Sequence, residues 1–468
     1  MENIIQYLRD ILKEESPEKT KAFIEFVYKK LSSEFEEHLM DIFRIKQNEV
    51  NQIPLTIPNA SVKKEYEYTL QVPSDYHDVE LCGLTAEEHG LEIQRVDGTN
   101  NYIIKGTPKQ AGTFDVTLRF KFESLLKDRP YIERKVQIII NPDPRDLWKN
   151  LPVDWDNMPE PKYMKEDTQH EYVLVEALPD GTPQKDIAAA SKRGRSHAQE
   201  GKPRDDHFKL KYMNNGWYVM AVADGAGSAK FSREGSRIAC NTVVDFCQTQ
   251  LMDNLQFEED IKLYNEFKGE SESEARKIVG DHIYKIVGTA AFKAHNAINK
   301  EAKEQNVPAK TYATTLLLTI CKKFPFGWFI ASFWVGDGAI CLFDQTASTA
   351  KLLGVPDEGE YAGQTRFLTM PEIFQDATSL YKRLRFNIVD DFTALFLMTD
   401  GVSDPMFETD ANLNNYAKWE QLWNNFATDK DNPVHLVDDN EKSAEELLNW
   451  LDFWSPGNHD DRTIAILY

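Results

Sequence analysis

The sequence predicts an α+β protein that contains more than one domain. Its 468 residues are too many for a single ordinary hydrophobic core. Apolar residues recur at helical spacing near the N-terminus and then alternate with polar residues, as they do in β-strands. Farther along, three apolar strand-like runs end in an Asp-Gly pair and are separated by long helix-like stretches. These patterns favour two N-terminal modules followed by a larger domain of strands and helices.

Two small modules are predicted before residue 142. Residues 1–48 carry apolar side chains on one helical face, with a break at Ser16 and Pro17, and predict a helical hairpin. Residues 50–141 alternate apolar and polar positions and predict a small all-β sandwich. Within it, the turn-then-strand sequence over 105–114 resembles that of bacterial immunoglobulin-like modules. Neither module carries a catalytic set of residues, so we expect them to recruit a protein partner or a substrate.

A linker and a larger domain are predicted to follow. Repeated prolines over residues 142–161 indicate an extended linker, and residues 162–468 form the predicted catalytic domain. Its strand-like runs are WYVMAVADG, WFIASFWVGDG and ALFLMTDG, with helix-like stretches over about 233–252 and 272–305. Residues 352–385 have two interpretations, a flap over the cleft or a plain loop.

The composition excludes several classes of function. The chain has 76 acidic against 54 basic residues and a formal net charge of -22, which repels nucleic acids and anionic membranes. Its five cysteines are scattered without a CxxC pair, so we expect free thiols in a reducing compartment. The N-terminal residues lack a signal-peptide pattern, and no stretch is long and apolar enough to span a membrane. We therefore expect a cytoplasmic protein.

Aspartates at strand ends are the candidate ligands of a metal site. Carboxylate oxygens are the ligands that Mg²⁺ and Mn²⁺ prefer. A single Asp-Gly pair is most often an ordinary turn, but three apolar strands that all end in one favour a shared site. Zinc is disfavoured, because His459 has no second histidine at helical spacing. The candidates are Asp206, Asp224, Asp337, Asp400, Asp404, Asp460 and Asp461.

Six short motifs occur in a defined order over residues 190–468. They are Arg204-Asp205-Asp206, Asp224-Gly225-Ala226-Gly227, Thr314-Thr315-Leu316, Gly336-Asp337-Gly338, Asp400-Gly401-Val402-Ser403-Asp404 and Asp460-Asp461-Arg462-Thr463. In this order they resemble the PPM, or type 2C, class of metal-dependent serine/threonine protein phosphatases. The chain is similar to a bacterial-like variant of that class with a helical and immunoglobulin-like N-terminal extension.

The resemblance implies a fold, a cofactor and a reaction. The fold is a sandwich of two antiparallel sheets flanked by helical pairs. Two Mn²⁺ or Mg²⁺ ions are bound by four aspartates and the carbonyl of Gly225, and a third ion by one of these aspartates and two further ones. A water that bridges the two ions attacks phosphoserine or phosphothreonine in a phosphoprotein, whose cognate serine/threonine kinase is the expected counterpart in signal transduction. The positions are Asp206, Asp224, Asp400 and Asp460 for the first two ions, and Asp337, Asp400 and Asp404 for the third.

Departures from the family pattern leave two roles open. The phosphate-binding arginine of the family corresponds here to Gly201, and the histidine that follows Asp-Gly corresponds to Ala226. Candidate replacements for the arginine are Arg204, Arg193, Arg195 and His197, each of which has an equally acceptable interpretation as a surface side chain. Candidates for the acid are His197, His207 and a metal-held water, and a reaction without a dedicated acid is the remaining alternative.

Two further questions stay open at this point. Asp205 and Asp461 are interpreted either as partners that orient the ligands or as members of surface ion pairs. Thr314 and Thr315 are interpreted as structural residues at the start of a buried element. The alternative function is a phosphatase-like binding or regulatory module with little or no turnover, although the intact aspartates favour the enzyme.

Overall fold

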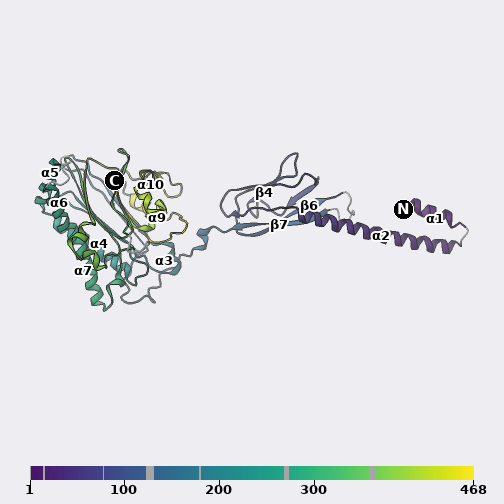
Figure 1. Cartoon of the computed structure of the whole chain (residues 1–468), viewed down its shortest axis with the longest axis horizontal. Coiled ribbons are helices and arrows are strands. Elements are labelled where there is room, and N and C mark those ends of the chain that lie inside the picture. The colour runs from purple at the N-terminus through teal and green to yellow at the C-terminus, as the bar shows by residue number, and fades with distance from the viewer. Residues whose placement is uncertain are drawn as a thin grey trace. The chain divides into compact units, whose positions relative to one another are not determined.

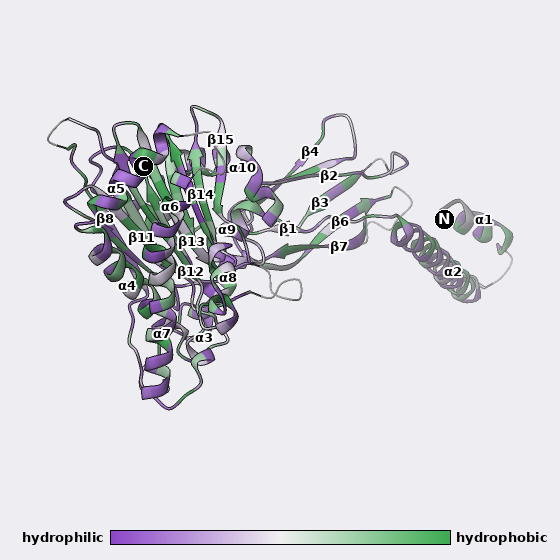
Figure 2. Cartoon of the chain, turned by 60° about the vertical axis from the view of Figure 1, so that its left-hand side comes forward, coloured by the Kyte–Doolittle hydropathy of each residue, from purple (hydrophilic) through white to green (hydrophobic). Residues whose placement is uncertain are grey.

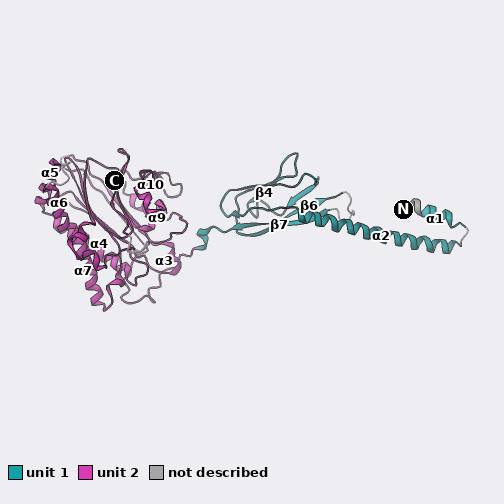
Figure 3. Ribbon diagram, in the orientation of Figure 1, with its two compact units in different colours: residues 1–147 teal, residues 148–468 magenta. Residues whose placement is uncertain are grey.

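The computed structural model describes residues 2–13, 16–76, 78–122, 131–178, 181–267, 274–357 and 365–468. The chain divides into two compact units, residues 1–147 and 148–468 (Figure 3). Helices and antiparallel sheets occur in both (Figure 1), which confirms the predicted α+β class. No helix of the described residues combines the length and hydropathy needed to cross a bilayer.

The first unit begins with two helices, α1 (Glu2–Ile11) and α2 (Pro17–Gln52). The Ser16 side chain caps α2 by accepting a hydrogen bond from the Lys19 amide, as the sequence break predicts. The helix continues past residue 48 and ends at Gln52. It ends there because Ile53 precedes Pro54, and a residue before proline is driven out of the helical conformation; Ile53 is extended, with ψ 126°.

The rest of the first unit is a β-sandwich. One sheet has the strand order β1-β7-β6-β3 and the other β2-β5-β4. Every second residue of β6, namely Val116, Leu118 and Phe120, is buried between the sheets, as the alternation predicts. The strands are β1 (Ala60–Ser61), β2 (Tyr66–Leu70), β3 (Val79–Cys82), β4 (Leu91–Arg95), β5 (Tyr102–Gly106), β6 (Gly112–Lys121) and β7 (Tyr131–Asn141).

A segment that we call the strap, residues 148–167, joins the first unit to the strands of the second. Its backbone carbonyls and side chains are bound to the second unit: Arg193 donates to the Leu151 carbonyl at 2.9 Å, and the Tyr163 hydroxyl donates to Glu301 at 2.5 Å. The ring of Trp148 lies 4.4 Å from that of His459. The predicted linker, 142–161, therefore spans the boundary between the two units, and its second half packs on the larger one.

Two antiparallel sheets form the centre of the second unit, as the family resemblance implies. Their strand orders are β10-β11-β12-β13-β16 and β15-β14-β17-β18-β9-β8. The strands are β8 (Thr168–Val173), β9 (Ile187–Lys192), β10 (His207–Tyr212), β11 (Trp217–Ala223), β12 (Leu316–Phe324), β13 (Gly327–Val335), β14 (Ala339–Asp344), β15 (Thr349–Gly354), β16 (Leu384–Val389), β17 (Ala394–Met398) and β18 (Arg462–Leu467).

Helices cover the outer face of each sheet. The first sheet packs against α4, α5, α6 and α7, and the second against α9, α10 and α11. A third apolar layer lies between the sheets, which explains why their strands are almost continuously hydrophobic (Figure 2). The helices are α3 (Arg195–Glu200), α4 (Ser232–Leu251), α5 (Leu255–Glu266), α6 (Glu274–Ile283), α7 (Thr289–Glu304), α8 (Ala377–Tyr381), α9 (Asp400–Phe407), α10 (Tyr416–Thr428) and α11 (Ser443–Trp450).

The region with two interpretations, 352–385, contains several ordered elements. It includes the end of β15, a 3-10 turn at Pro371–Phe374, α8 and the start of β16. Ile373 and Leu380 are buried against the first sheet and its helices. Residues 358–364 lie outside the described residues, so the flap interpretation stays a prediction for that part.

A tightly packed glycine lets α9 start beside β18. A Cβ atom on Gly401 would lie 1.9 Å from the Asp461 carbonyl oxygen, whereas a Cβ atom on Gly280 in α6 would meet open space. We expect Gly401→Ala to lower the free energy of unfolding by about 2 kcal/mol, because overpacking forces the backbone apart. Gly280→Ala should be neutral or stabilise by up to about 1 kcal/mol, because alanine favours helix. Chemical denaturation of both variants checks this, and equal effects would contradict it.

Candidate metal centre

Antiparallel pairing brings aspartates from distant parts of the sequence to the same end of neighbouring strands in the first sheet. His207 at the start of β10 pairs with Ala223 at the end of β11. Asp206 and Asp224 are the next residues outward on these two strands, so they lie at the same edge. The start of β12 and the end of β13 pair in the same way, with Leu316 opposite Val335, and this places Asp337 there as well.

The second sheet contributes the remaining aspartates to the same end of the sandwich. Met398 at the end of β17 pairs with Ile464 of β18, so Asp400 and Asp460 follow and precede neighbouring strands. Two threonines join the sheets: the hydroxyls of Thr399 and Thr463 donate to Oδ2 of Asp206 at 2.9 and 2.6 Å. Both threonines are buried. Thr463 belongs to the sixth motif, but threonines are common in strands, so no local pattern indicated that either residue binds Asp206.

A cluster of three carboxylates forms the centre of this arrangement. One oxygen from each of Asp224, Asp337 and Asp400 lies within 4.8 Å of the others. Among the described residues, the buried Oδ1 atoms of Asp206, Asp337 and Asp400 have no hydrogen-bond partner. Buried acceptors without donors are costly, and an all-oxygen set of carboxylates is what Mg²⁺ and Mn²⁺ prefer. The residues present therefore fit these cations.

Burial and mutual repulsion shift the pKa values of these carboxyl groups upward. Burial, together with repulsion from Asp461, raises the pKa of Asp206 to about 7. Burial and the carboxylate of Asp400 raise the pKa of Asp224 well above its ordinary value, and burial and Asp337 do the same for Asp400. The pKa of Asp460 is also raised, mainly by burial. Each shift reflects negative charge that the folded chain does not balance by itself.

Asp404 lies at the margin of the cluster, on the first turns of α9. Burial and repulsion from Asp337 raise the pKa of Asp404 to about 6. Its Oδ2 atom accepts a 3.5 Å hydrogen bond from Asn458, and Asp337 accepts one from the Thr365 hydroxyl. Asp404 and Asp337 thus each accept a hydrogen bond from a neutral donor, although Oδ1 of Asp337, like Oδ1 of Asp400, has no partner.

The backbone on either side of Asp224 is held by the two threonines of the third motif. The Asp224 amide donates to the Thr315 hydroxyl at 2.9 Å, and the Thr315 amide donates to the Asp224 carbonyl at 2.8 Å. Thr314 also donates to that carbonyl, at 2.7 Å, and pairs with Gly225 in an isolated β-bridge. A Cβ atom on Gly225 would lie 2.8 Å from the Asp205 carbonyl, so only glycine fits there. These threonines are structural residues of the site.

Asp461 is a buried anchor behind the cluster. Its carboxylate accepts hydrogen bonds from the amides of Gly194 and Asp205 at 2.6 and 2.5 Å, and its Oδ2 atom lies 3.1 Å from Nδ1 of His197. Although burial would raise the pKa of Asp461, His197 and the two amides hold it below its ordinary value. Burial would lower the pKa of His197, but Asp461 raises it to about 10. This geometry favours the orienting role for Asp461 over a surface ion pair.

The candidate arginines donate to protein groups. Arg204 is buried and donates to the Glu166 carbonyl, the Ser191 hydroxyl and the Asp206 carbonyl. Arg193 donates to the strap and to Lys202, and Arg195 donates to the carbonyls of Asp452 and Phe453. These contacts show positioning roles, and a phosphate-binding role for Arg204 stays a prediction. Gly201 ends α3 in the left-handed conformation, with φ 67°.

Two other polar residues, His207 and Lys165, lie near the site, and only the first was a candidate from the sequence. His207, a candidate acid, is half-buried with an enclosed Nδ1 atom, and desolvation lowers its pKa well below the ordinary value. Lys165 of the strap donates to the carbonyls of Asp205 and Arg233 and to Ser236. Burial, with Arg204, lowers the pKa of Lys165 to about 7. A lone lysine in a proline-rich stretch carries no sequence signal for such a position.

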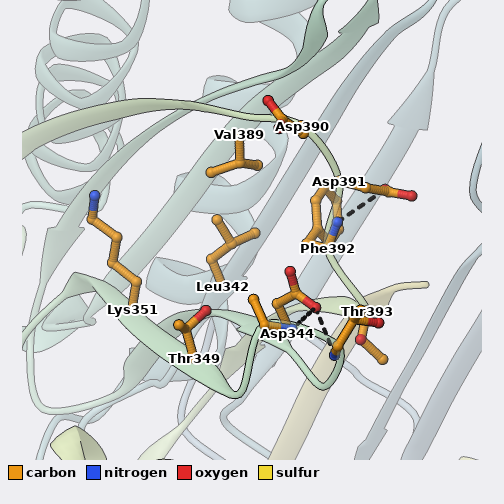
Figure 4. A pocket seen from close by; sticks show the side chains of 11 residues that line it. Leu342, Asp344, Thr349, Lys351, Val389, Asp390, Asp391, Phe392 and Thr393 are labelled. Atoms are coloured by element: carbon orange, nitrogen blue, oxygen red, sulfur yellow. Dashed lines mark hydrogen bonds between the residues drawn. The ribbon is translucent and has the colours of Figure 1, made fainter. Parts of the chain in front are cut away.

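A separate pocket of about 630 Å³ lies away from these aspartates (Figure 4). It is lined by the β14–β15 hairpin and the loop between β16 and β17. Asp344, at the C-terminal end of β14, lines the pocket, whereas Asp337 precedes the N-terminal end of that strand. Its carboxylates are already bonded: Asp391 accepts from Trp328 and Phe392, and Asp344 from two backbone amides. The pocket therefore shows no second set of unpaired metal ligands.

Comparison with known protein families gives one match. The family model described as protein phosphatase 2C matches residues 193–452, more than half of the chain. No curated protein matches the sequence.

Solved structures of phosphatases are among those with a similar fold. RsbX in complex with magnesium is 14% identical, with 64% of this chain and 100% of that chain covered and a TM-score of 0.33. A Caenorhabditis elegans sex determining protein is 14% identical, with 61% and 65% covered and a TM-score of 0.38. The Mycobacterium tuberculosis serine/threonine phosphatase PstP/Ppp is 12% identical, with 61% and 98% covered and a TM-score of 0.35. The match to the family model is the stronger finding.

The raised pKa values predict how stability depends on pH and cations. Without a cation, Asp404 and Asp206 stabilise the fold in their protonated forms, fully below about pH 4, and this contribution is lost as pH rises through about 6 and 7. A bound cation replaces those protons. We therefore expect Mn²⁺ to raise the melting temperature more at about pH 8 than at about pH 5.5, relative to chelator.

Differential scanning fluorimetry of the full chain measures this difference. Asp438→Asn is the matched control, because Asp438 belongs to a separate acidic group with Asp186 and Asp439. The control should keep the pH-dependent Mn²⁺ effect. A Mn²⁺ effect of equal size at both pH values would show that these carboxyl groups do not exchange protons for the cation.

Proposed function

The chain belongs to the protein phosphatase 2C family, and from this premise we propose that it hydrolyses phosphoserine and phosphothreonine in proteins with Mg²⁺ or Mn²⁺. The observation that carries the proposal is the cluster of Asp224, Asp337 and Asp400 beside the unpaired oxygen of Asp206. Five segments that are far apart in the sequence supply carboxylates to one end of the sandwich. The stability of the fold does not require such a concentration of negative charge, so a function is its better explanation.

Each carboxylate has a proposed task. Asp206, Asp224, Asp400 and Asp460 would hold two cations with help from the Gly225 carbonyl, and Asp337 and Asp404 would hold a third with Asp400. When bound, the cations would neutralise charge on the phosphoryl oxygens and lower the pKa of the water that acts as the nucleophile. Thr399, Thr463 and Thr315 keep the ligands in place, because their hydroxyls bind Asp206 and the backbone of Asp224.

The cysteines support a water nucleophile over a thiol. Cys240, Cys247, Cys321 and Cys341 are fully buried, and burial raises the pKa of each thiol far above its ordinary value. Buried thiols of this kind are poor nucleophiles. Cys82 is half-buried and lies in the first unit.

His197 is the proposed proton donor or phosphate contact. Its Nδ1 atom is bound to Asp461, and a Cβ atom on Gly227 would lie 3.6 Å from its Nε2 atom. The free side of the ring thus faces the Asp224–Gly227 loop. Arg204 could reach the substrate only by giving up its bonds to Ser191 and Asp206, so we propose that it orients the loop that carries Asp206.

The first functional test separates the two groups of aspartates. Activity on a phosphopeptide should disappear in chelator and return with Mn²⁺ or Mg²⁺. Asp224→Asn and Asp400→Asn should lower kcat by roughly a thousandfold, because each removes a charge that balances the core cations. Asp404→Asn should keep tight binding of two Mn²⁺ ions and raise the Mn²⁺ concentration needed for full turnover.

Calorimetric titration of Mn²⁺, paired with rate measurements, decides between the outcomes. Asp438→Asn, outside the cluster, is the control and should behave as the unaltered chain. Loss of tight binding in Asp404→Asn, with none in Asp224→Asn, would reverse the assignment of the sites. Tight cation binding without hydrolysis of any phosphopeptide would instead support the alternative, a phosphatase-like regulatory module.

The first unit is proposed to select the substrate. Among the described residues, the clustered carboxylates all belong to the second unit. A cognate serine/threonine kinase and a cytoplasmic location complete the proposal. They follow from the reaction and from the composition of the chain, with its sparse cysteines and net charge of -22.

Shortened chains test this division of tasks. A chain that starts at residue 148 keeps the strap and should hydrolyse a small aryl phosphate about as fast as the full chain, while losing selectivity for its phosphoprotein. A chain that starts at residue 168 lacks the groups that bind Arg193, Arg204 and Arg233, and it should lose both stability and activity. Circular dichroism checks folding in each case. A folded 148–468 chain without aryl phosphatase activity would show that the first unit belongs to the active site.

A further inference from the structure

The long helix α2 carries an apolar face that the described part of its own chain covers only in part. Of its 36 residues only Val50 is buried. A helix of this length is about 54 Å long and ordinarily owes its stability to a packed apolar face. Apolar side chains nevertheless recur on one side at spacings of four, four, three and three. We call this set the α2 stripe; it consists of Leu31, Phe35, Leu39, Ile42 and Ile45.

Contacts within the first unit involve only parts of α2. Near its start, the Thr20 hydroxyl donates to the carbonyl of Leu12, just after α1 (Figure 1). Near its end, Phe43 packs on the sandwich, and the Lys46 ammonium lies 5.7 Å from the centre of the Phe122 ring. Phe35, between these contacts, is 61% exposed. An apolar stripe of this length on a water-exposed helix marks an interaction surface.

The charges along α2 identify the partner. Residues 17–30 contain four lysines and two glutamates, whereas residues 31–49 contain five acidic and two basic residues. The N-terminal half is therefore positive and the C-terminal half negative. Two copies in parallel would place like charges side by side, and two antiparallel copies place opposite charges together. A twofold, self-complementary contact is also the commonest way in which identical chains associate.

We propose that α2 pairs in an antiparallel manner with α2 of a second copy of this chain. With Phe35 of the two copies at the twofold axis, Leu31 of one faces Leu39 of the other. The same alignment brings opposite charges together on both flanks of the stripe: Lys21 with Glu49 and Glu25 with Lys46 on one flank, and Lys30 with Asp41 on the other. The stripe of each copy then lies along the α1–α2 hairpin of the other, where Tyr7, Ile11 and Phe23 are exposed.

Sedimentation velocity of the full chain over a range of concentrations tests the pairing. The unaltered chain should form dimers, and Phe35→Glu should raise the dissociation constant by at least about tenfold. Phe26→Glu is the matched control: Phe26 is 63% exposed, and nine residues at about 100° each place it on the opposite side of the helix from Phe35. Both variants change an exposed residue, so neither should disturb the fold. A monomer at all concentrations, or equal effects of the two variants, would overturn the proposal.

Cysteine cross-linking tests the direction of the pairing. Cys82 is first replaced by serine, since the other four cysteines are buried. Lys21→Cys and Glu49→Cys chains should form a disulfide-linked dimer under mild oxidation only when they are mixed. A Lys21→Cys chain that cross-links efficiently with itself would indicate parallel helices and overturn the antiparallel arrangement.

Discussion

Mutual repulsion among buried carboxylates is the constraint on which the second unit depends. Asp206, Asp224 and Asp400 meet at one edge of the sandwich, and burial raises the pKa of all three. A fold that gathers this much negative charge is stable only when protons or cations balance it. The same imbalance favours hard divalent cations over other metals, because these cations bind most strongly to oxygen ligands that are already in place.

Neutral hydroxyls and one ion pair keep the carboxylates in place without neutralising them. Thr399 and Thr463 reach Asp206 from the opposite sheet, so the distance between the sheets and the geometry of the site are set together. The neighbours Asp460 and Asp461 show how strongly surroundings decide a role. Burial raises the pKa of Asp460, as it does for the other carboxyl groups of the cluster, whereas His197 and two amides hold the pKa of Asp461 low. The first can accept a cation, and the second anchors α3 and the Asp206 loop.

The strap, which belongs to the second unit, packs beside this centre. The Trp148 ring contacts that of His459, the residue before Asp460, and Lys165 donates to the Asp205 carbonyl next to Asp206. A chain paired through α2 would carry two such catalytic units on one assembly. Phosphoproteins with several phosphorylated sites would then meet a second active site at a raised effective concentration after the first had bound.

The sequence alone determined the α+β class, the helical start and the alternating strands, because these depend on local periodicity and on caps such as Ser16. It also identified the clustered aspartates, since Asp-Gly pairs at the ends of apolar strands recur in a fixed order. Other features depended on contacts between segments far apart in the chain. Residues 148–161 read as a free linker because their prolines break periodicity, yet Arg193 and Trp148 attach them to the second unit. Likewise, no local pattern distinguishes Asp461 from Asp460 or shows that Arg204 is enclosed by backbone carbonyls. Only tertiary structure decides these roles, because burial, charge balance and hydrogen-bond partners are properties of the packed surroundings and not of the residue.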